Sequence, residues 1–163
     1  MSDSSKEEVR ITPTYTPIGI NGVSWVMVEA NLFEYPVPKG KKPALFGSLC
    51  TKCDRVFFPQ RELCPDCFEE GGMVMKRLDS KGVIYASTLV QIPSPAGIKP
   101  PYAYGYVDIP VDKIRIHALF DGTDLATLAP GTEVELVIGP FAVNKQGQNI
   151  IGYKYRPVQS RRV

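Results

Sequence analysis

The chain has 163 residues, 44% hydrophobic and 22% charged, which are the proportions of an ordinary globular protein able to bury a core. Its 19 basic and 17 acidic side chains leave a net charge of +2, so no broad positive field favours nucleic acid. No run reaches the ~20 apolar residues of a membrane span, and the polar start MSDSSKEEVR has no signal stretch, so we expect a cytoplasmic protein.

The N-terminal part offers one candidate element, at residues 23–33. This run contains no Pro or Gly, and Trp25, Val28 and Leu32 recur at helical spacing, which predicts a short helix. A Val-rich run of this length is also compatible with a strand. Residues 35–43 hold three prolines, three lysines and a glycine, a composition that ends a helix and makes an extended linker.

The four cysteines form two C-x-x-C pairs, Cys50 with Cys53 and Cys64 with Cys67, separated by ten residues. Two such turns can direct four thiolates at one cation, and their clustering is typical of a metal site in a reducing compartment. The pattern predicts a closed, structural zinc site that cannot activate water. Redox-active pairs or unrelated thiols are lesser alternatives, and a single iron, with an electron-carrier role, would use the same donors.

Short β-prone runs separated by turn residues follow the cysteines, and five of them predict a small barrel. In the clearest run, Ile114, Ile116 and Phe120 share one face, which specifies its register. The predicted strands cover residues 83–90, 102–108, 114–120, 133–138 and 150–155.

No group of residues forms a recognisable active site. A lone strand histidine such as His117 is usually a packed or surface residue, and every cysteine is taken by the predicted metal site. The aspartates at 108, 112, 121 and 124 flank turns, where Asp is favoured for local hydrogen bonding. The Pro- and Tyr-rich residues 92–106 suit recognition of a partner or a flat ring, or else pack inward over the barrel.

Several segments together resemble a known family, in which a rubredoxin-like zinc ribbon precedes an OB-fold domain in proteins associated with thiolases and other acyl-CoA enzymes. The resemblance covers roughly residues 45–158 and includes LCTKCDRVFFPQRELCPDCFEEG, GVIYASTLVQIP, PPYAYGYVDIP, KIRIHALFDGTDLATLAPGTEVELVIG and IIGYKYRPV. It implies a mainly β protein with a zinc ribbon (45–78) followed by a five-stranded OB-fold domain (79–158). Outside the resemblance, we expect an N-terminal extension and linker with a short helix (1–44) and a basic tail (159–163).

The same resemblance implies a non-catalytic accessory subunit in a hetero-oligomer with a thiolase-like or related acyl-CoA enzyme. The chain would then count as part of an acyltransferase complex that cleaves a β-ketoacyl-CoA with coenzyme A, and the resemblance points to benzoylsuccinyl-CoA of anaerobic toluene degradation. The alternative is a single-stranded nucleic-acid-binding protein, because zinc ribbons and OB barrels both serve that role. The near-neutral charge disfavours it.

A coenzyme A thioester at the partner interface would need cations for its phosphates. Lysines beside prolines are the candidates, because point cations on stiff loops suit phosphate, although such lysines are equally compatible with simple solvation. The four positions are Lys39, Lys41, Lys42 and Lys99.

Overall fold

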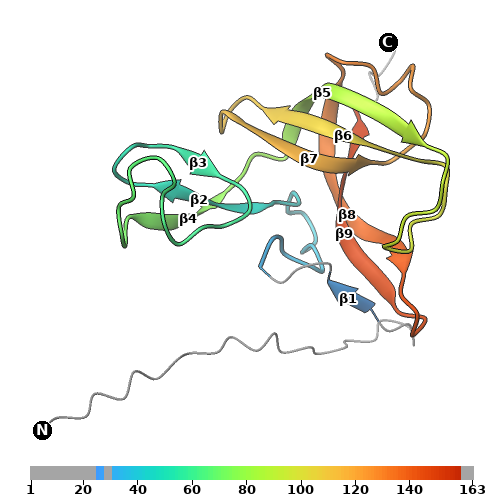
Figure 1. The fold of residues 1–163 in the computed structure, drawn as a ribbon, viewed down its shortest axis with the longest axis horizontal. Coiled ribbons are helices and arrows are strands. Elements are labelled where there is room, and N and C mark those ends of the chain that lie inside the picture. Colours follow the sequence, from blue (N-terminus) through green and yellow to red (C-terminus); the bar gives the residue numbers. More distant parts are fainter. Residues whose placement is uncertain (1–24, 28–30, 159–163) are drawn as a thin grey trace, which may run out of the picture.

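All nine elements of secondary structure in the described residues, which are 25–27 and 31–158 of this computed structural model, are strands. They form a three-stranded sheet and a separate six-stranded sheet (Figure 1). The strands are β1 Trp25–Met27, β2 Phe46–Cys50, β3 Val56–Phe57, β4 Met73–Arg77, β5 Lys81–Val90, β6 Tyr102–Ile109, β7 Ile114–Phe120, β8 Glu133–Val143 and β9 Asn149–Pro157.

The three-stranded sheet carries the cysteines. Its order is β3-β2-β4, with both neighbours antiparallel to β2. Few of its residues are buried, and the fully buried side chains Cys50 and Cys64 are themselves predicted metal ligands. The sheet is therefore too small to be held by apolar packing alone.

The larger sheet closes into a barrel through the order β9-β7-β6-β5-β8, because β8 pairs with β9 again. All neighbours are antiparallel except β7 and β9, which run parallel. The predicted alternation of β7 is confirmed, since Ile116, Ala118 and Phe120 are buried while Arg115 and His117 are exposed. The OB-type barrel thus has its own core of inward-facing residues.

One predicted element differs from the structure. The helix expected at residues 23–33 is not found among the described residues. Trp25–Met27 is a strand that pairs in parallel with Asn149, Ile150 and Ile151 of β9, and residues 31–33 form a turn that ends in an isolated bridge from Phe33 to Leu45. Residues 23, 24 and 28–30 of that prediction lie outside the described residues. The local sequence was compatible with either a helix or a strand, and pairing with the edge of β9 makes residues 25–27 a strand.

The two sheets meet through a packed junction beside β9. The ring of Phe58, just after β3, meets Tyr153 edge-on at 5.7 Å between centroids, and Phe33 approaches the same tyrosine at 6.5 Å. The buried carboxylate of Asp112, in the β6–β7 turn, accepts a hydrogen bond from the backbone N–H of Asp79 at 2.7 Å. These contacts fix the ribbon against the barrel.

Candidate metal centre

The four cysteines lie on two turns that have the same local geometry. Cys50 ends β2 and its carbonyl accepts a hydrogen bond from the N–H of Asp54 at 2.9 Å, while the carbonyl of Cys64 accepts one from Phe68 at 3.0 Å. Asp54 and Phe68, each directly after the second cysteine of its pair, adopt positive φ values of 55° and 54°. Each turn thus bends its two thiols toward the same side.

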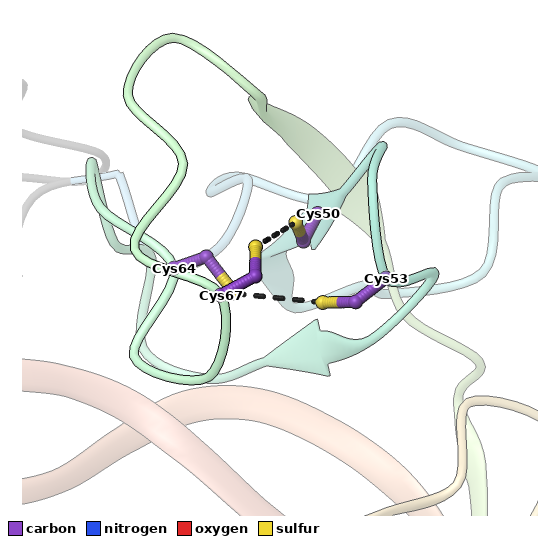
Figure 2. A group of neighbouring side chains, drawn as sticks. All are labelled: Cys50, Cys53, Cys64 and Cys67. Carbon is purple, nitrogen blue, oxygen red and sulfur yellow. Dashed lines mark hydrogen bonds between the residues drawn. The ribbon is translucent and has the colours of Figure 1, made fainter.

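The sulfur atoms converge on one point between the turns (Figure 2). All four Sγ atoms lie within 4.8 Å of one another, with Cys50 and Cys67 at 3.6 Å and Cys53 and Cys64 at 3.5 Å. Sulfur atoms about 2.3 Å from a tetrahedral zinc are about 3.8 Å apart, so the cluster fits such an ion. The sequence prediction of one four-cysteine cluster is confirmed, and these residues could hold a metal.

The thiols influence each other's ionisation strongly. Hydrogen bonding from the backbone N–H of Cys53 lowers the pKa of the Cys50 thiol to about 6, whereas loss of solvation raises the pKa of the Cys53 thiol to about 12. Neighbouring thiolates repel, and without a cation they cannot all ionise together. A divalent ion would remove that repulsion, because cysteine binds metals as the thiolate.

Two exposed ion pairs join the turns across the cluster. Lys52 contacts Glu69 and Arg55 contacts Asp66, each at 2.6 Å. Pairs this exposed contribute little stability individually. They do connect the first turn to the second around the sulfur atoms, which favours the closed arrangement of the site.

Four thiolates around one ion fill a tetrahedron and leave no position for water or substrate. Such a centre stabilises the fold and performs no Lewis-acid step of its own. The Val56–Phe57 strand next to it does not form a core of its own. Val56 and Phe58 instead pack against the main core cluster, while Phe57 lies beside the guanidinium of Arg55.

The other candidate residues are scattered over the surface. Lys39, Lys41 and Lys42 are exposed on the segment before β2, and Lys99 is exposed on the loop between β5 and β6. His117 is exposed between the rings of Tyr104 and Tyr106, at 5.1 and 5.5 Å. The sequence interpretation of this histidine as a surface residue is thus confirmed.

Of the aspartates, Asp124 makes the local hydrogen bond that the turn interpretation predicts, whereas Asp108 lies in β6 and pairs across the strands with Arg115 of β7. Asp108 binds Arg115 through two hydrogen bonds of 2.6 and 3.0 Å. Asp124 accepts a hydrogen bond from the N–H of Ala126 at 2.9 Å. Both carboxylates thus have structural partners, one across two strands and one within a turn.

Sequence reasoning missed a groove on the barrel, where Phe141 and Gly152 lie beside Tyr102 and Tyr153. Its residues come from separate strands, so no local spacing could reveal it. The only signal was the run of tyrosines in residues 92–106.

The sequence matches two domains of one family: the ChsH2 rubredoxin-like zinc ribbon domain over residues 39–72, and the ChsH2 C-terminal OB-fold domain over residues 75–139. It is 36% identical to benzoylsuccinyl-CoA thiolase subunit BbsA of Thauera aromatica over 133 residues, covering 78% of this chain and 85% of the relative. The identity to the subunit of the same name from Geobacter metallireducens is 34%, covering 75% and 81%.

More distant similarities agree on the fold. A DUF35 domain-containing scaffold protein of Methanothermobacter thermautotrophicus is 28% identical and matches 69% of this chain and 86% of its own length. The solved structure of the Ltp2-ChsH2(DUF35) aldolase aligns with a TM-score of 0.56 at 18% identity, covering 70% of this chain and 84% of the other. Within the described residues, no helix is long and apolar enough to span a bilayer.

Proposed function

This chain belongs to the ChsH2 family of rubredoxin-like zinc ribbon and OB-fold proteins, and we propose that it is a non-catalytic accessory subunit of a thiolase-like acyl-CoA enzyme. In this proposal it binds one structural zinc and works as a hetero-oligomer in the cytoplasm. The complex would carry out CoA-dependent cleavage of a β-ketoacyl-CoA, with benzoylsuccinyl-CoA as the first substrate to test.

The observation that carries the proposal is the similarity to two thiolase subunits along more than four fifths of their length. The chemistry of the chain agrees with an accessory role. All four cysteines belong to one closed cluster, so none is available as the nucleophile that acyl transfer needs. Within the part of the chain that the structure describes, no histidine is paired with a carboxylate as a general base.

The ribbon exposes several large apolar side chains that a partner could cover. Phe68 and Met75 are 70% and 69% exposed, and Val74 and Leu63 are also exposed. Large apolar side chains on an ordered surface often mark protein contacts. Phe68 directly follows the second metal turn, so the predicted zinc would fix its position for docking.

Coenzyme A is proposed to meet the chain through lysines at the partner interface. Lys39, Lys41, Lys42 and Lys99 are exposed, and no carboxylate of the described residues lies within ion-pair distance of them. An unpaired ammonium is free to bind phosphate. Replacing each by Gln should raise the KM for CoA of the complex while leaving kcat unchanged, with Lys145→Gln as the exposed control. Unchanged kinetics would remove these residues from the proposal.

The direct test is to co-express the chain with a thiolase-like protein from the same organism and purify the pair through a tag on one chain. We expect a stable complex whose CoA-dependent cleavage needs both chains. The variant Phe68→Asp should weaken the complex while keeping its metal content, and Val111→Asp, an exposed apolar position on the barrel, is the matched control. A chain that purifies alone, with no effect on the partner's activity, would refute the accessory role.

Single-stranded nucleic-acid binding remains the second candidate, because Tyr85 and Tyr106 expose their rings on the barrel and Arg115 lies 3.2 Å from the Tyr85 ring centre. Such aromatic and cationic surfaces can stack bases. Fluorescence anisotropy with a labelled oligonucleotide at two salt concentrations tests it. Salt-sensitive binding would support it, and constant anisotropy would exclude it.

A further inference from the structure

The barrel carries a groove built from two adjoining cavities of about 540 and 470 Å³. Both are lined by Ile98, Tyr102, Leu119 and Phe141, so they adjoin at these side chains, and we call the pair the barrel groove. It lies on β6, β7 and β9, beside the β8 bulge and the β5–β6 loop. A concave site of this size can hold a small organic ligand.

The aromatic wall of the groove is built by a bulge in β8. Phe141 is the extra residue where the pairing of β8 with β9 shifts between Pro140 and Ala142. Its ring lies directly over Gly152, where a Cβ atom would come within 2.4 Å of the ring. A bulge often re-aims one side chain beside a functional site, and the glycine leaves room for this one.

The loop over the groove is held in a fixed shape. Ser94 donates its backbone N–H to the carbonyl of Ile98 at 3.1 Å, its own carbonyl accepts a hydrogen bond from the N–H of Gly97 at 3.0 Å, and prolines flank the turn on both sides. Gly97 approaches β8 closely, since a Cβ there would lie 3.1 Å from the carbonyl of Val143. The groove is therefore preformed, which lowers the entropic cost of binding.

The two compartments differ in chemistry. The larger is aromatic, with Tyr102, Tyr104 and Tyr153 beside Phe141. The smaller is lined by Lys99, Lys154 and Asp121. Asp121 lies 4.0 Å from the ammonium of Lys154, while no carboxylate of the described residues is within ion-pair distance of Lys99. A ligand that fills both must join a flat ring to an anion through a spacer.

We propose that the barrel groove binds a nucleotide, with its base in the aromatic compartment and its phosphate beside Lys99. A benzoate-like acid joins ring and anion directly and would fill one compartment only. An oligonucleotide needs a series of cations, whereas the groove has two. The groove itself is independent of the accessory role, but the choice of nucleotide rests on the proposed function, because coenzyme A ends in an adenosine phosphate.

The test is calorimetric titration of the full, zinc-loaded chain without a partner, using adenosine 3′,5′-bisphosphate as the probe. We expect saturable binding, and weaker binding of adenosine, inorganic phosphate, benzoate and a short oligodeoxyadenylate at equal nucleotide concentration. Lys99→Gln should raise Kd about tenfold, the effect of one charge-assisted hydrogen bond, and Lys81→Gln, an exposed lysine on β5, should leave it unchanged.

The aromatic wall is tested separately with Gly152→Ala, which should displace the Phe141 ring, and with Phe141→Leu. Loss of base stacking predicts a Kd at least about fivefold higher for either variant. If either variant fails to fold, the Kd of the Lys99→Gln variant alone tests the proposal. Three results would overturn the proposal. The bisphosphate could give no heat of binding at millimolar concentration, inorganic phosphate could bind as tightly as the nucleotide, or Lys99→Gln and Lys81→Gln could change Kd equally. Complex formation with the thiolase-like partner is measured in a separate experiment, so the accessory role and nucleotide binding in the groove can be refuted independently.

Discussion

Removing one metal ligand should open the ribbon and leave the barrel folded. Cys64→Ser replaces a fully buried sulfur that lies 3.5 Å from Cys53. Binding of a structural zinc contributes on the order of 10 kcal/mol, as much as the whole stability of many small domains. The ribbon has few other sources of stability around the metal turns, because its exposed ion pairs are weak and its buried leucines, Leu45 and Leu78, belong to the main core cluster.

The barrel should respond differently, because its core does not depend on the metal. Its inward-facing residues, including Ile84, Val107, Ile109 and Tyr155, are almost fully buried. Only the junction around Phe58 and Tyr153 should loosen. We therefore expect the free energy of opening to fall by several kcal/mol in the ribbon and to stay almost constant in the barrel.

Amide hydrogen exchange read by mass spectrometry separates the two parts within the full chain. The amides of β2 and β4 should lose protection in Cys64→Ser, and in the original protein after a strong chelator, while β6 and β7 keep theirs. Glu70→Gln is the control, since it alters an exposed side chain near the second turn and removes no thiolate. Equal loss of protection in barrel and ribbon, or a ribbon protected without metal, would refute the reasoning.

Substitutions at three further positions test the packing. Asp112→Ala leaves the Asp79 N–H without its acceptor and should cost about 1–3 kcal/mol in urea denaturation, while Asp112→Asn should cost less. Tyr155→Phe should raise the free energy of unfolding by about 1 kcal/mol, because the buried hydroxyl has no partner among the described residues. Burial also raises the Tyr155 pKa, so stability present at neutral pH should fall above pH 10 in the original protein more than in the variant. Gly105→Ala should cost about 3 kcal/mol or more, or prevent folding, since its Cβ would lie 1.9 Å from the Ala86 carbonyl oxygen.

The sequence predicted those features that arise from local chemistry. The spacing of the cysteines predicted a cluster, since two C-x-x-C turns can meet only around a common centre. Alternation at residues 114–120 predicted a strand with one buried face, because successive side chains of a strand point to opposite faces of the sheet. The turn at Asn144 also depends on local chemistry, because its side chain accepts hydrogen bonds from the backbone N–H groups of Gln146 and Gln148.

Features that depend on distant partners escaped prediction. Trp25–Met27 is a strand because β9, more than a hundred residues later, offers it a free edge. The bulge at Phe141 depends on the register between two strands, and no residue pattern marks it. The groove follows from that bulge together with Gly152 and the β5–β6 loop, so its sequence signal was limited to the tyrosines of β6.

The side chain of Tyr153 contacts the ribbon and also lines the barrel groove. Phe58 packs edge-on against Tyr153, whose hydroxyl donates a hydrogen bond to the carbonyl of His117 at 3.0 Å and whose side chain also lines the groove. A packed contact of this kind holds two parts at a fixed separation, whereas a switch would need a second stable arrangement. If the ribbon docks a partner and the barrel binds a nucleotide, Tyr153 would set where that nucleotide lies relative to the partner. The chain would then assist the reaction by positioning the nucleotide relative to the partner, a role that requires no catalytic residue in this chain.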